Sequence, residues 1–426
     1  MKRDAGGPCL TAKPPVTAAR PRLLPEVAGP GAVALREHLA RHGPRPSCAG
    51  DWHRRQRLIG EVENAGLTGR GGAGFPTAKK LRTLAVGRRT PQMIANGVEG
   101  EPASDKDKVL LSRAPHLVID GAVSAAELTG ATEAVIVAHP AAYHAVRDAA
   151  RERRAAGYDQ VPIRVLAAAD GFTAGEASAV LRWTEGGAPA PTGRPPRFGR
   201  LGHQPALVQN VETLAHLALI MRHGASWFRS AGTPAEPGTM LVTLLGAVRR
   251  PGVYEAEPGV PVSGLLDLAG GPAQPPGALL IGGYFGTWVA AAGALDLPFS
   301  AAGLSPLGAG IVAVLPSATC GLAETARLTR YLANSSAGQC GPCMFGLDAI
   351  ARELERAAAG GSGDLTRVRG WLRDVTGRGA CHHPDGTALM VGSALRAFRD
   401  EIALHARGRC SATSSAGILP VPEQPS

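Results

Sequence analysis

The run Gly69-Arg-Gly-Gly-Ala-Gly-Phe-Pro-Thr77 decides the fold of this chain, and Lys80 and Asn96-Gly-Val-Glu-Gly-Glu-Pro102 follow it. Glycines let backbone N–H groups approach a phosphate closely, because no side chains stand in the way. Arg70 and Lys80 add positive charge, and the carboxylates after Asn96 can bind polar groups of a ring or a ribose. The combination is typical of a site for a flavin or a nicotinamide nucleotide.

The sequence around this run predicts an α/β domain over residues 51–235. Apolar residues at helical spacing predict a helix over 52–65 that leads into the glycine run. Further helices are predicted over 117–129 and 143–156, and strands over 92–95, 134–138 and 161–166. Strands that alternate with helices of this length favour a parallel sheet. Glu99 and Glu101 would then follow the carboxyl end of a strand, where open α/β sheets bind ligands.

A second glycine-containing stretch, Gly171-Phe-Thr-Ala-Gly175-Glu176, follows a predicted strand and opens a predicted helix over 177–183. A helix start suits a negatively charged group. This stretch is therefore a second candidate part of the site.

The rest of the chain predicts two smaller domains and two extensions. Short β runs around one helix predict a β-grasp domain over 236–318, and apolar stripes predict a four-helix bundle over 319–408. Proline, glycine and isolated charges predict a flexible extension over 1–50, and a serine- and proline-rich composition predicts a disordered tail over 409–426.

Seven cysteines, an odd number, argue against a disulfide framework. Cys340-Gly-Pro-Cys343 and the distant Cys381 form a moderately specific metal-binding pattern, and the alternative is a pair of reduced cysteines at a helix start. The scattered histidines lack ligand spacing and are interpreted as surface or packed residues.

The net charge of +10 has several explanations, and an arginine-rich solvated surface is favoured over nucleic acid, because no nucleic-acid module is recognisable. No window reaches the roughly 18 consecutive apolar residues of a membrane span, and the start lacks the apolar core of a secretory signal. We expect a cytoplasmic protein that does not itself span a membrane, peripheral to the inner face of the membrane where a partner holds it there.

In this order the motifs resemble the NADH-binding, FMN-carrying flavoprotein subunit of respiratory complex I, which is the F-type subunit of NADH-quinone oxidoreductase. The resemblance includes a later signature, Asn210-Val-Glu-Thr-Leu214, and implies that its Asn and Thr help bind the FMN phosphate. The resemblance implies that Glu99 and Glu101 contact the flavin and the nicotinamide nucleotide, and that Phe75 stacks on the adenine of NADH. It implies binding of FMN and NAD(H) by Gly69, Arg70, Gly71, Gly72, Gly74, Phe75, Lys80, Asn96, Gly175, Glu176, Asn210 and Thr213.

The resemblance also implies an iron–sulfur cluster, of the 4Fe-4S type, on Cys340, Cys343 and Cys381. Ala337 stands where the family has the first cysteine of the run. A substitute ligand from Cys320, His382 or His383, a three-iron cluster, a labile cluster or no cluster are the alternatives.

The function implied is that of an NADH dehydrogenase: hydride passes from NADH to FMN, and single electrons leave through the cluster to a partner iron–sulfur protein or a membrane reductase module. The alternative is a scaffold or FMN-binding module that has lost NADH oxidation. It is motivated by departures from the family pattern at Val98, Asp105, Ala177 and Gln209.

Overall fold

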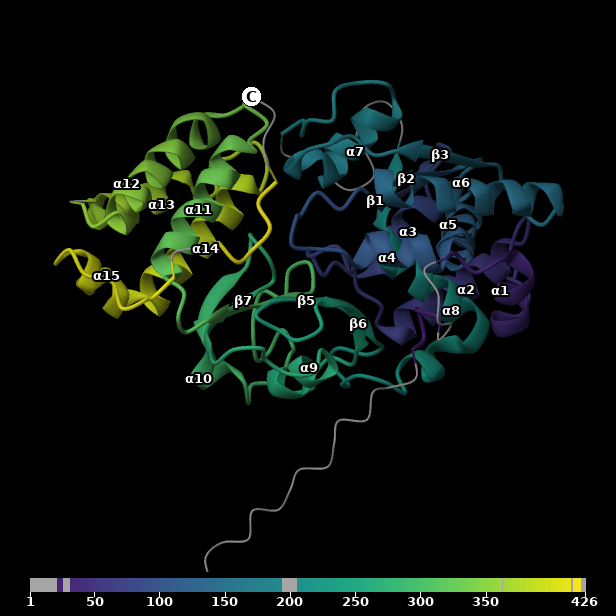
Figure 1. Ribbon diagram of the computed structural model, residues 1–426. Coiled ribbons are helices and arrows are strands. Elements are labelled where there is room, and N and C mark those ends of the chain that lie inside the picture. Colours follow the sequence, from purple (N-terminus) through teal and green to yellow (C-terminus); the bar gives the residue numbers. More distant parts are fainter. Residues whose placement is uncertain (1–20, 26–30, 194–204, 362, 415–416, 423–426) are drawn as a thin grey trace, which may run out of the picture.

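The structure, a computed structural model, describes residues 21–25, 31–193, 205–361, 363–414 and 417–422. Figure 1 shows three regions: a helix-covered sheet coloured purple to teal, a second sheet in green, and a group of green to yellow helices.

The first sheet is parallel, and its strand order is β3-β2-β1-β4. Its strands are β1 (Gln92–Gly97), β2 (Ala134–Ala138), β3 (Ile163–Ala167) and β4 (Ala206–Asn210). Its helices are α2 (Trp52–Ala65), α3 (Thr77–Ala85), α4 (Lys106–Arg113), α5 (Pro115–Thr129), α6 (Pro140–Ala155), α7 (Ala177–Thr184) and α8 (Val211–Phe228). The α/β class predicted for this part of the chain is confirmed.

The strand order creates a switch point between β1 and β4. From β1 the chain builds β2 and β3 on one side and later returns to add β4 on the other side. The connections therefore leave the carboxyl ends of β1 and β4 in opposite directions and open a crevice between them. Asn96 and Asn210 are register partners at this edge.

The prediction of a flexible extension is wrong for residues 31–50, whereas 1–20 and 26–30 lie outside the described residues. This segment contains α1 (Leu35–His42) and is held by polar contacts that leave no local sequence pattern. His38 Nε2 lies 2.7 Å from the buried Asp120 carboxylate, and Glu127 accepts from the backbone N–H of Cys48 at 2.7 Å and from Arg45 at 2.7 Å.

The second sheet is mixed, in the order β6-β5-β9-β7-β8, with β5 and β9 parallel. Its elements are β5 (Met240–Gly246), β6 (Gly252–Ala256), α9 (Val262–Leu268), β7 (Pro276–Ile281), β8 (Thr287–Ala290), α10 (Ala291–Ala294) and β9 (Ile311–Pro316). Strand residues such as Val242, Leu279 and Val314 pack against Leu265 of α9 in one apolar core. Burial of this face is the main source of stability for so short a set of strands.

The last region is helical, and its helices pack on one another. They are α11 (Gly321–Asn334), a π-helical turn η2 (Pro342–Leu347), α12 (Asp348–Ala358), α13 (Leu365–Val375), α14 (His383–Ala397) and α15 (Arg399–His405). Leu328, Leu332, Leu354 and Val391 are fully buried in the shared core.

The prediction of a disordered tail is wrong for residues 417–421; 415–416 and 423–426 are not described. Glu324 of α11 accepts from the backbone N–H groups of Ile418 and Leu419, and Tyr284 of the second region donates to the carbonyl of Pro420. The amino-acid composition of the segment gives no sign of these contacts, because the partners lie far away in the sequence.

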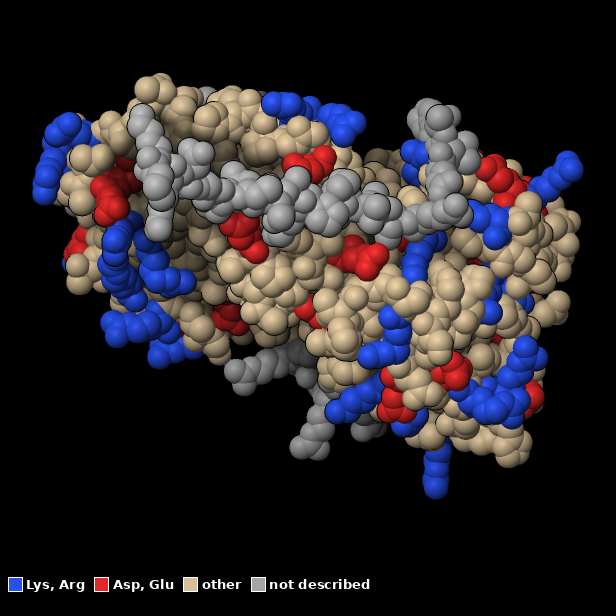
Figure 2. Space-filling view, turned by 90° about the horizontal axis from the view of Figure 1, so that it is seen from below, with Lys and Arg blue, Asp and Glu red and all other residues tan. Residues whose placement is uncertain are grey.

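The surface shown in Figure 2 carries charged side chains of both signs. On the face in Figure 2, Lys and Arg side chains form several separate groups with Asp and Glu between them. No helix within the described ranges combines the length and the apolar character needed to cross a membrane.

Candidate functional site

A cavity of about 560 Å³ opens at the carboxyl ends of β1 and β4, where the switch point places it. All three regions of the molecule line it. From the first come Gly71, Gly72, Ala73, Asn96, Glu99, Gly100, Glu101, Ser104, Lys106, Asp107, Phe172, Thr173, Gly175, Glu176 and Asn210; from the others come Gly282, Phe285, Pro306, Gly308, Ala309, Cys381, His382 and His383.

The glycine run forms one wall of the cavity beside the N-terminus of α8. Thr213 Oγ1 accepts from the backbone N–H of Arg70 at 2.8 Å, which fixes the loop on this helix start. A Cβ at Gly71 would stand 3.3 Å from Asn210, and Gly72 has a φ of +99°, which L side chains rarely adopt. The loop therefore needs glycine both for space and for backbone conformation.

Predicted site residues cap the starts of α8 and of α7. Asn210 Oδ1 accepts from the N–H of Glu212, and its Nδ2 donates to Asp107 at 2.6 Å. Glu176 accepts from the N–H groups of Ser178 and Ala179 at the start of α7. These caps satisfy first-turn amides and hold the strand ends and the helix starts in register.

Asn96 ties the end of β1 to the second glycine-containing stretch. Its Nδ2 donates to the carbonyl of Gly175 at 2.9 Å, in the 3₁₀ turn η1 (Phe172–Gly175). The two stretches singled out from the sequence are thereby joined across 79 residues.

Glu99 lies in the cavity wall and binds the start of α4 to the loop after β1. Its carboxylate accepts from Ser104 Oγ at 2.6 Å and from the N–H groups of Asp107 and Lys108 at 2.9 and 2.8 Å, the first turn of α4. Burial, followed by the neighbouring Asp107 carboxylate, raises the pKa of Glu99 to about 7. Its φ of +49° makes it a non-glycine residue in the left-handed region, a conformation that persists where the surroundings enforce it.

Glu101 has one carboxylate oxygen with a partner and one without. Its Oε2 accepts from the N–H of Tyr284 at 3.2 Å, whereas its Oε1 is buried without a hydrogen-bond partner in the part of the chain that the structure describes. Burial raises the pKa of Glu101 to about 8. A buried polar atom without a partner is costly, and a donor on a bound ligand would remove that cost.

Sequence reasoning missed Lys106, which lies in a buried ion-pair group. Its Nζ is 2.7 Å from Asp107 and 3.0 Å from Glu212. Burial alone would lower the pKa of Lys106, but the carboxylates of Asp107 and Glu212 outweigh it and raise the pKa. Glu212 lies 106 positions away in the sequence, so no local motif could have shown the group.

A group of aromatic rings between the three regions was also missed. Phe172 contacts Phe285 edge-on at 4.9 Å between ring centroids, and His383 lies 5.5 Å from both rings. Phe172 and Phe285 each stand beside glycines, which is the only local signal. The rings separate the cavity from the core of the C-terminal helices.

Several predicted site residues do not line the cavity: Gly69, Arg70, Gly74, Phe75, Lys80, Thr213, Cys340 and Cys343. The Arg70 guanidinium donates to the carbonyl of Pro237 at 3.1 Å, and burial lowers its pKa. Lys80 Nζ donates to Gln209 at 3.3 Å and lies 5.9 Å from the centre of the Phe75 ring. The positive charge expected beside the glycine run is thus directed away from the cavity.

The departures from the family pattern are accommodated outside the cavity. Val98 is buried among Ile94, Val137 and Ala174 and does not line the cavity. Asp105 is exposed and pairs with Lys108 at 2.6 Å. Val98 therefore contributes apolar packing and does not block the cavity.

The three predicted metal ligands lie near the far wall of the cavity. Cys343 is buried, Cys340 and Cys381 are half-buried, and Cys381 lines the cavity itself. Burial, followed by the adjacent Cys340 thiol and by Cys381, raises the pKa of Cys343. We call Cys340, Cys343 and Cys381 the cysteine trio.

The candidate substitute ligands are not equivalent. Cys320 precedes α11 and Cys340 follows it, so the length of this 14-residue helix, about 21 Å at 1.5 Å per residue, separates them. His382 is exposed and bonds Asp385, and His383 Nε2 lies 2.7 Å from the carbonyl oxygen of Leu332. Cys320 is therefore too far away, which leaves the two histidines next to Cys381.

Comparison with protein-family models gives three matches. Residues 62–219 match the Nuo51 FMN-binding domain, residues 241–281 the SLBB domain, and residues 323–405 the NADH-ubiquinone oxidoreductase-F iron-sulfur binding region. The matched ranges follow the three regions of the structure.

Among curated proteins, the chain is similar to an F-type subunit of the NADH-quinone oxidoreductase of Rhizobium meliloti, the copy numbered 2, with 32% identity over 90% of this chain and 94% of the relative. It is 34% identical to the F-type subunit of the NADH-quinone oxidoreductase of Streptomyces coelicolor, over 83% of each chain.

Among solved structures, it is similar to a chain of the NAD+-reducing [NiFe]-hydrogenase in the H2-reduced and air-oxidized states. The TM-scores are 0.76 and 0.78 at 31% and 30% identity, over 83% and 87% of this chain. The chain spans 63% and 65% of those longer hydrogenase chains.

Proposed function

Because the chain belongs to the family of F-type subunits of NADH-quinone oxidoreductase, we propose that it is an NADH dehydrogenase flavoprotein subunit that uses FMN and an iron–sulfur cluster. The observation that carries the proposal is the cavity between β1 and β4, which reaches from the glycine run to Cys381. The proposed flavin site in the cavity thus lies next to the proposed cluster site, with Cys381 between them.

The residues present fit FMN. Carboxylates of Glu99, Glu101 and Asp107 line the cavity, and the Lys106 ammonium is already paired. A phosphate would therefore be held on the glycine side, by the backbone amides of Gly71, Gly72 and Ala73 and the N-terminus of α8, with Asn210 and Thr213 fixing the helix start. When bound, FMN would supply the conversion between a two-electron hydride donor and one-electron acceptors.

The free oxygen of Glu101 would accept a hydrogen bond from the ring system or the nicotinamide, and Asn96 and Glu176 would hold the opposite wall. Glu99 would position α4 rather than react. We propose that Arg70 and Lys80 act through the loop they brace. We also propose that Phe75, whose ring centre lies 5.8 Å from Lys79 Nζ and 5.9 Å from Lys80 Nζ, is the candidate for the adenine of NADH.

The cysteine trio would hold the cluster, with His382 or His383 as the candidate for the position of Ala337. The Nδ1 atom of His383 is buried without a partner within the described ranges, and its ring lines the cavity. A cluster held there would supply one-electron transfer close to the flavin.

We also propose that α11, α12, α13 and α14 form the predicted four-helix bundle, and that the domains divide near residues 235 and 318. Phe345 and Met344, beside the trio, are 71% and 50% exposed. This exposed apolar pair supports docking of a partner iron–sulfur protein, or of a membrane reductase module that would hold the chain at the inner face of the membrane.

The test is the visible spectrum of the anaerobically purified protein. We expect flavin bands that bleach when NADH is added, and FMN in the supernatant after denaturation. The variant Gly71→Val, which fills the space beside Asn210, should lose most of the FMN. Gly370→Ala, where a Cβ meets nothing within 4 Å, is the matched control.

A protein that stays colourless after reconstitution with FMN would contradict the proposal and favour a scaffold. Flavin that is present but does not bleach with NADH would favour the FMN-binding module without NADH oxidation.

A further inference from the structure

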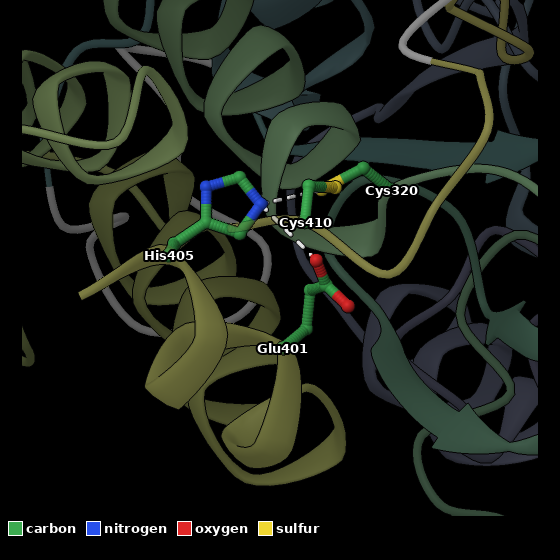
Figure 3. A group of neighbouring side chains, drawn as sticks. All are labelled: Cys320, Glu401, His405 and Cys410. Carbon is green, nitrogen blue, oxygen red and sulfur yellow. Dashed lines mark hydrogen bonds and ion pairs between the residues drawn. The ribbon is translucent and has the colours of Figure 1, made fainter. Parts of the chain in front are cut away.

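A second group of metal-binding side chains lies at the N-terminus of α11, at the opposite end of this helix from the cysteine trio. It consists of Cys320, Glu401, His405 and Cys410, which we call the tail cluster. Figure 3 shows Glu401 and His405 projecting from α15 toward Cys320 and Cys410. Neither the redox site nor the matched relatives' names account for this group.

The distances within the tail cluster are close to those of a tetrahedral metal site. One ligand atom from each residue lies within 4.8 Å of the other three. Cys320 Sγ is 3.4 Å from His405 Nε2, and His405 Nε2 is 3.1 Å from Glu401 Oε1. A tetrahedral zinc ion at ordinary bond lengths separates neighbouring sulfur, nitrogen and oxygen ligands by about 3.3–3.8 Å.

Surrounding groups orient the ligand atoms. His405 Nδ1 lies 3.2 Å from the carbonyl of Ala357; a proton there leaves the Nε2 lone pair facing the other three residues. Glu401 accepts from the N–H and the hydroxyl of Ser411, and Cys320 Sγ accepts from the N–H of Ala323 in the first turn of α11. A helix start stabilises a thiolate.

The chain segments that meet here are joined by backbone contacts as well. The N–H of Cys320 donates to the carbonyl of Ser414 at 3.2 Å, and the N–H of Thr413 donates to the carbonyl of Ala318 at 3.0 Å. The cluster thus stands where residues 409–414 cross the start of α11, and the exposed Cys410 leaves it accessible to ions from solution.

From this geometry we propose that the tail cluster binds one zinc ion that fixes the C-terminal segment to α11 and α15. Two thiolates, an imidazole and a carboxylate suit zinc better than magnesium or calcium, which prefer oxygen ligands. Four protein ligands close the coordination shell, as in structural rather than catalytic zinc sites. A disulfide between Cys320 and Cys410 would leave the convergence of Glu401 and His405 on the same point without a reason.

The test measures zinc and iron in the full-length protein, purified from zinc-supplemented cells, by elemental mass spectrometry. We expect about one zinc per chain, as a closed four-ligand site holds a single ion. Cys410→Ser should lose zinc and keep iron, because Cys410 is exposed and lies outside the cysteine trio. Cys410→His, which supplies another zinc ligand, should keep it, and so should Cys48→Ala, which removes a cysteine elsewhere.

A second readout is Co²⁺ added to protein stripped of zinc, which should give the visible bands of tetrahedral cobalt–thiolate in the wild type and not in Cys410→Ser. The proposal is overturned if the wild type takes up neither zinc nor cobalt, or if zinc content is the same in Cys410→Ser. Iron at this group, or an intact Cys320–Cys410 disulfide in peptide mapping, would overturn it as well. The FMN content does not enter the result, so failure here is distinguishable from failure of the proposed function.

Discussion

At the scale of single residues, Glu101 shows how burial changes the pKa of a carboxyl group in this molecule. Burial raises the pKa of Glu101 to about 8 from an ordinary value of 4.5. Since the folded state holds this proton more tightly than the unfolded chain does, the stability it contributes is complete below pH 4.5 and is lost as the pH rises through about 8.

Replacement of Glu101 by Gln should therefore flatten the fall in stability between pH 5 and pH 9. The amide stays neutral, so the variant should exceed the wild type in stability at pH 9 by about 4–5 kcal/mol and differ much less at pH 5. Chemical denaturation at the two pH values measures this. Glu133→Gln, at an exposed ion pair with Arg164, is the control, and parallel pH profiles for Glu101→Gln and the wild type would refute the assignment.

Cys343→Ser should remove most of the iron and leave FMN in place, because Cys343 is the buried member of the cysteine trio whereas the glycine wall is untouched. Iron and flavin assays on the same anaerobic preparation check this. Equal iron in the variant would show that the cluster ligands lie elsewhere, and loss of both cofactors would point to a folding defect.

Some of these residues could be predicted from the sequence, and others could not. The glycine run, Asn96 and the cysteine trio belong to short sequence motifs, and the structure places these motifs in or near the walls of the cavity. Lys106 carries none, because its partner Glu212 lies on an element far away in the chain.

At the scale of elements, the carboxylate of Asp120 links helix α5 to three other helices. Its carboxylate lies 2.7 Å from Arg153 of α6, 2.7 Å from His38 of α1 and against Arg222 of α8, and it is fully buried. Burial opposes its charge, but the hydrogen bond from His38 and the charges of the two arginines outweigh that cost and lower the pKa of Asp120.

Asp120→Ala should destabilise the protein by about 3–5 kcal/mol, because it leaves two buried guanidinium groups without their common carboxylate. Asp148→Ala removes an exposed partner of Arg147 on α6 and should cost less than about 1 kcal/mol. Urea unfolding measures both. A cost for Asp120→Ala no larger than that of the control would show that the arginines find other partners.

The elements themselves were largely predictable where their pattern is local. The strand over 134–138 and the helix over 52–65 have the predicted bounds, since apolar periodicity and a capping Asp51 mark them. Helix α1 was missed because a polar contact with Asp120 of α5, far away in the sequence, helps to hold it. Helix α4 was missed because it is short and its apolar residues Leu110 and Leu111 are adjacent in sequence, which gives no helical periodicity.

At the scale of the whole molecule, the described part of the C-terminal segment fastens the helical region to the second sheet. Arg327 of α11 donates to the carbonyl of Leu419, and Tyr284 beside β7 donates to the carbonyl of Pro420. Leu419 is 3% exposed.

Deletion of residues 417–426 should lower the melting temperature by several degrees, because it exposes the apolar surface under Leu419 and removes the hydrogen bonds that Glu324 and Arg327 make to the backbone of this segment. Deletion of 423–426 alone is the control and should have little effect. Differential scanning fluorimetry compares the three chains, and equal melting temperatures would show that the docked segment contributes no stability.

The shared cavity also constrains how the protein is made. The glycine wall is complete once α8 has been synthesised, but Phe285 and Cys381, which close the opposite wall, leave the ribosome much later. A nascent chain therefore has half a pocket, and the coenzyme can be enclosed only after translation has passed α14 and the helical region has folded back onto the first sheet.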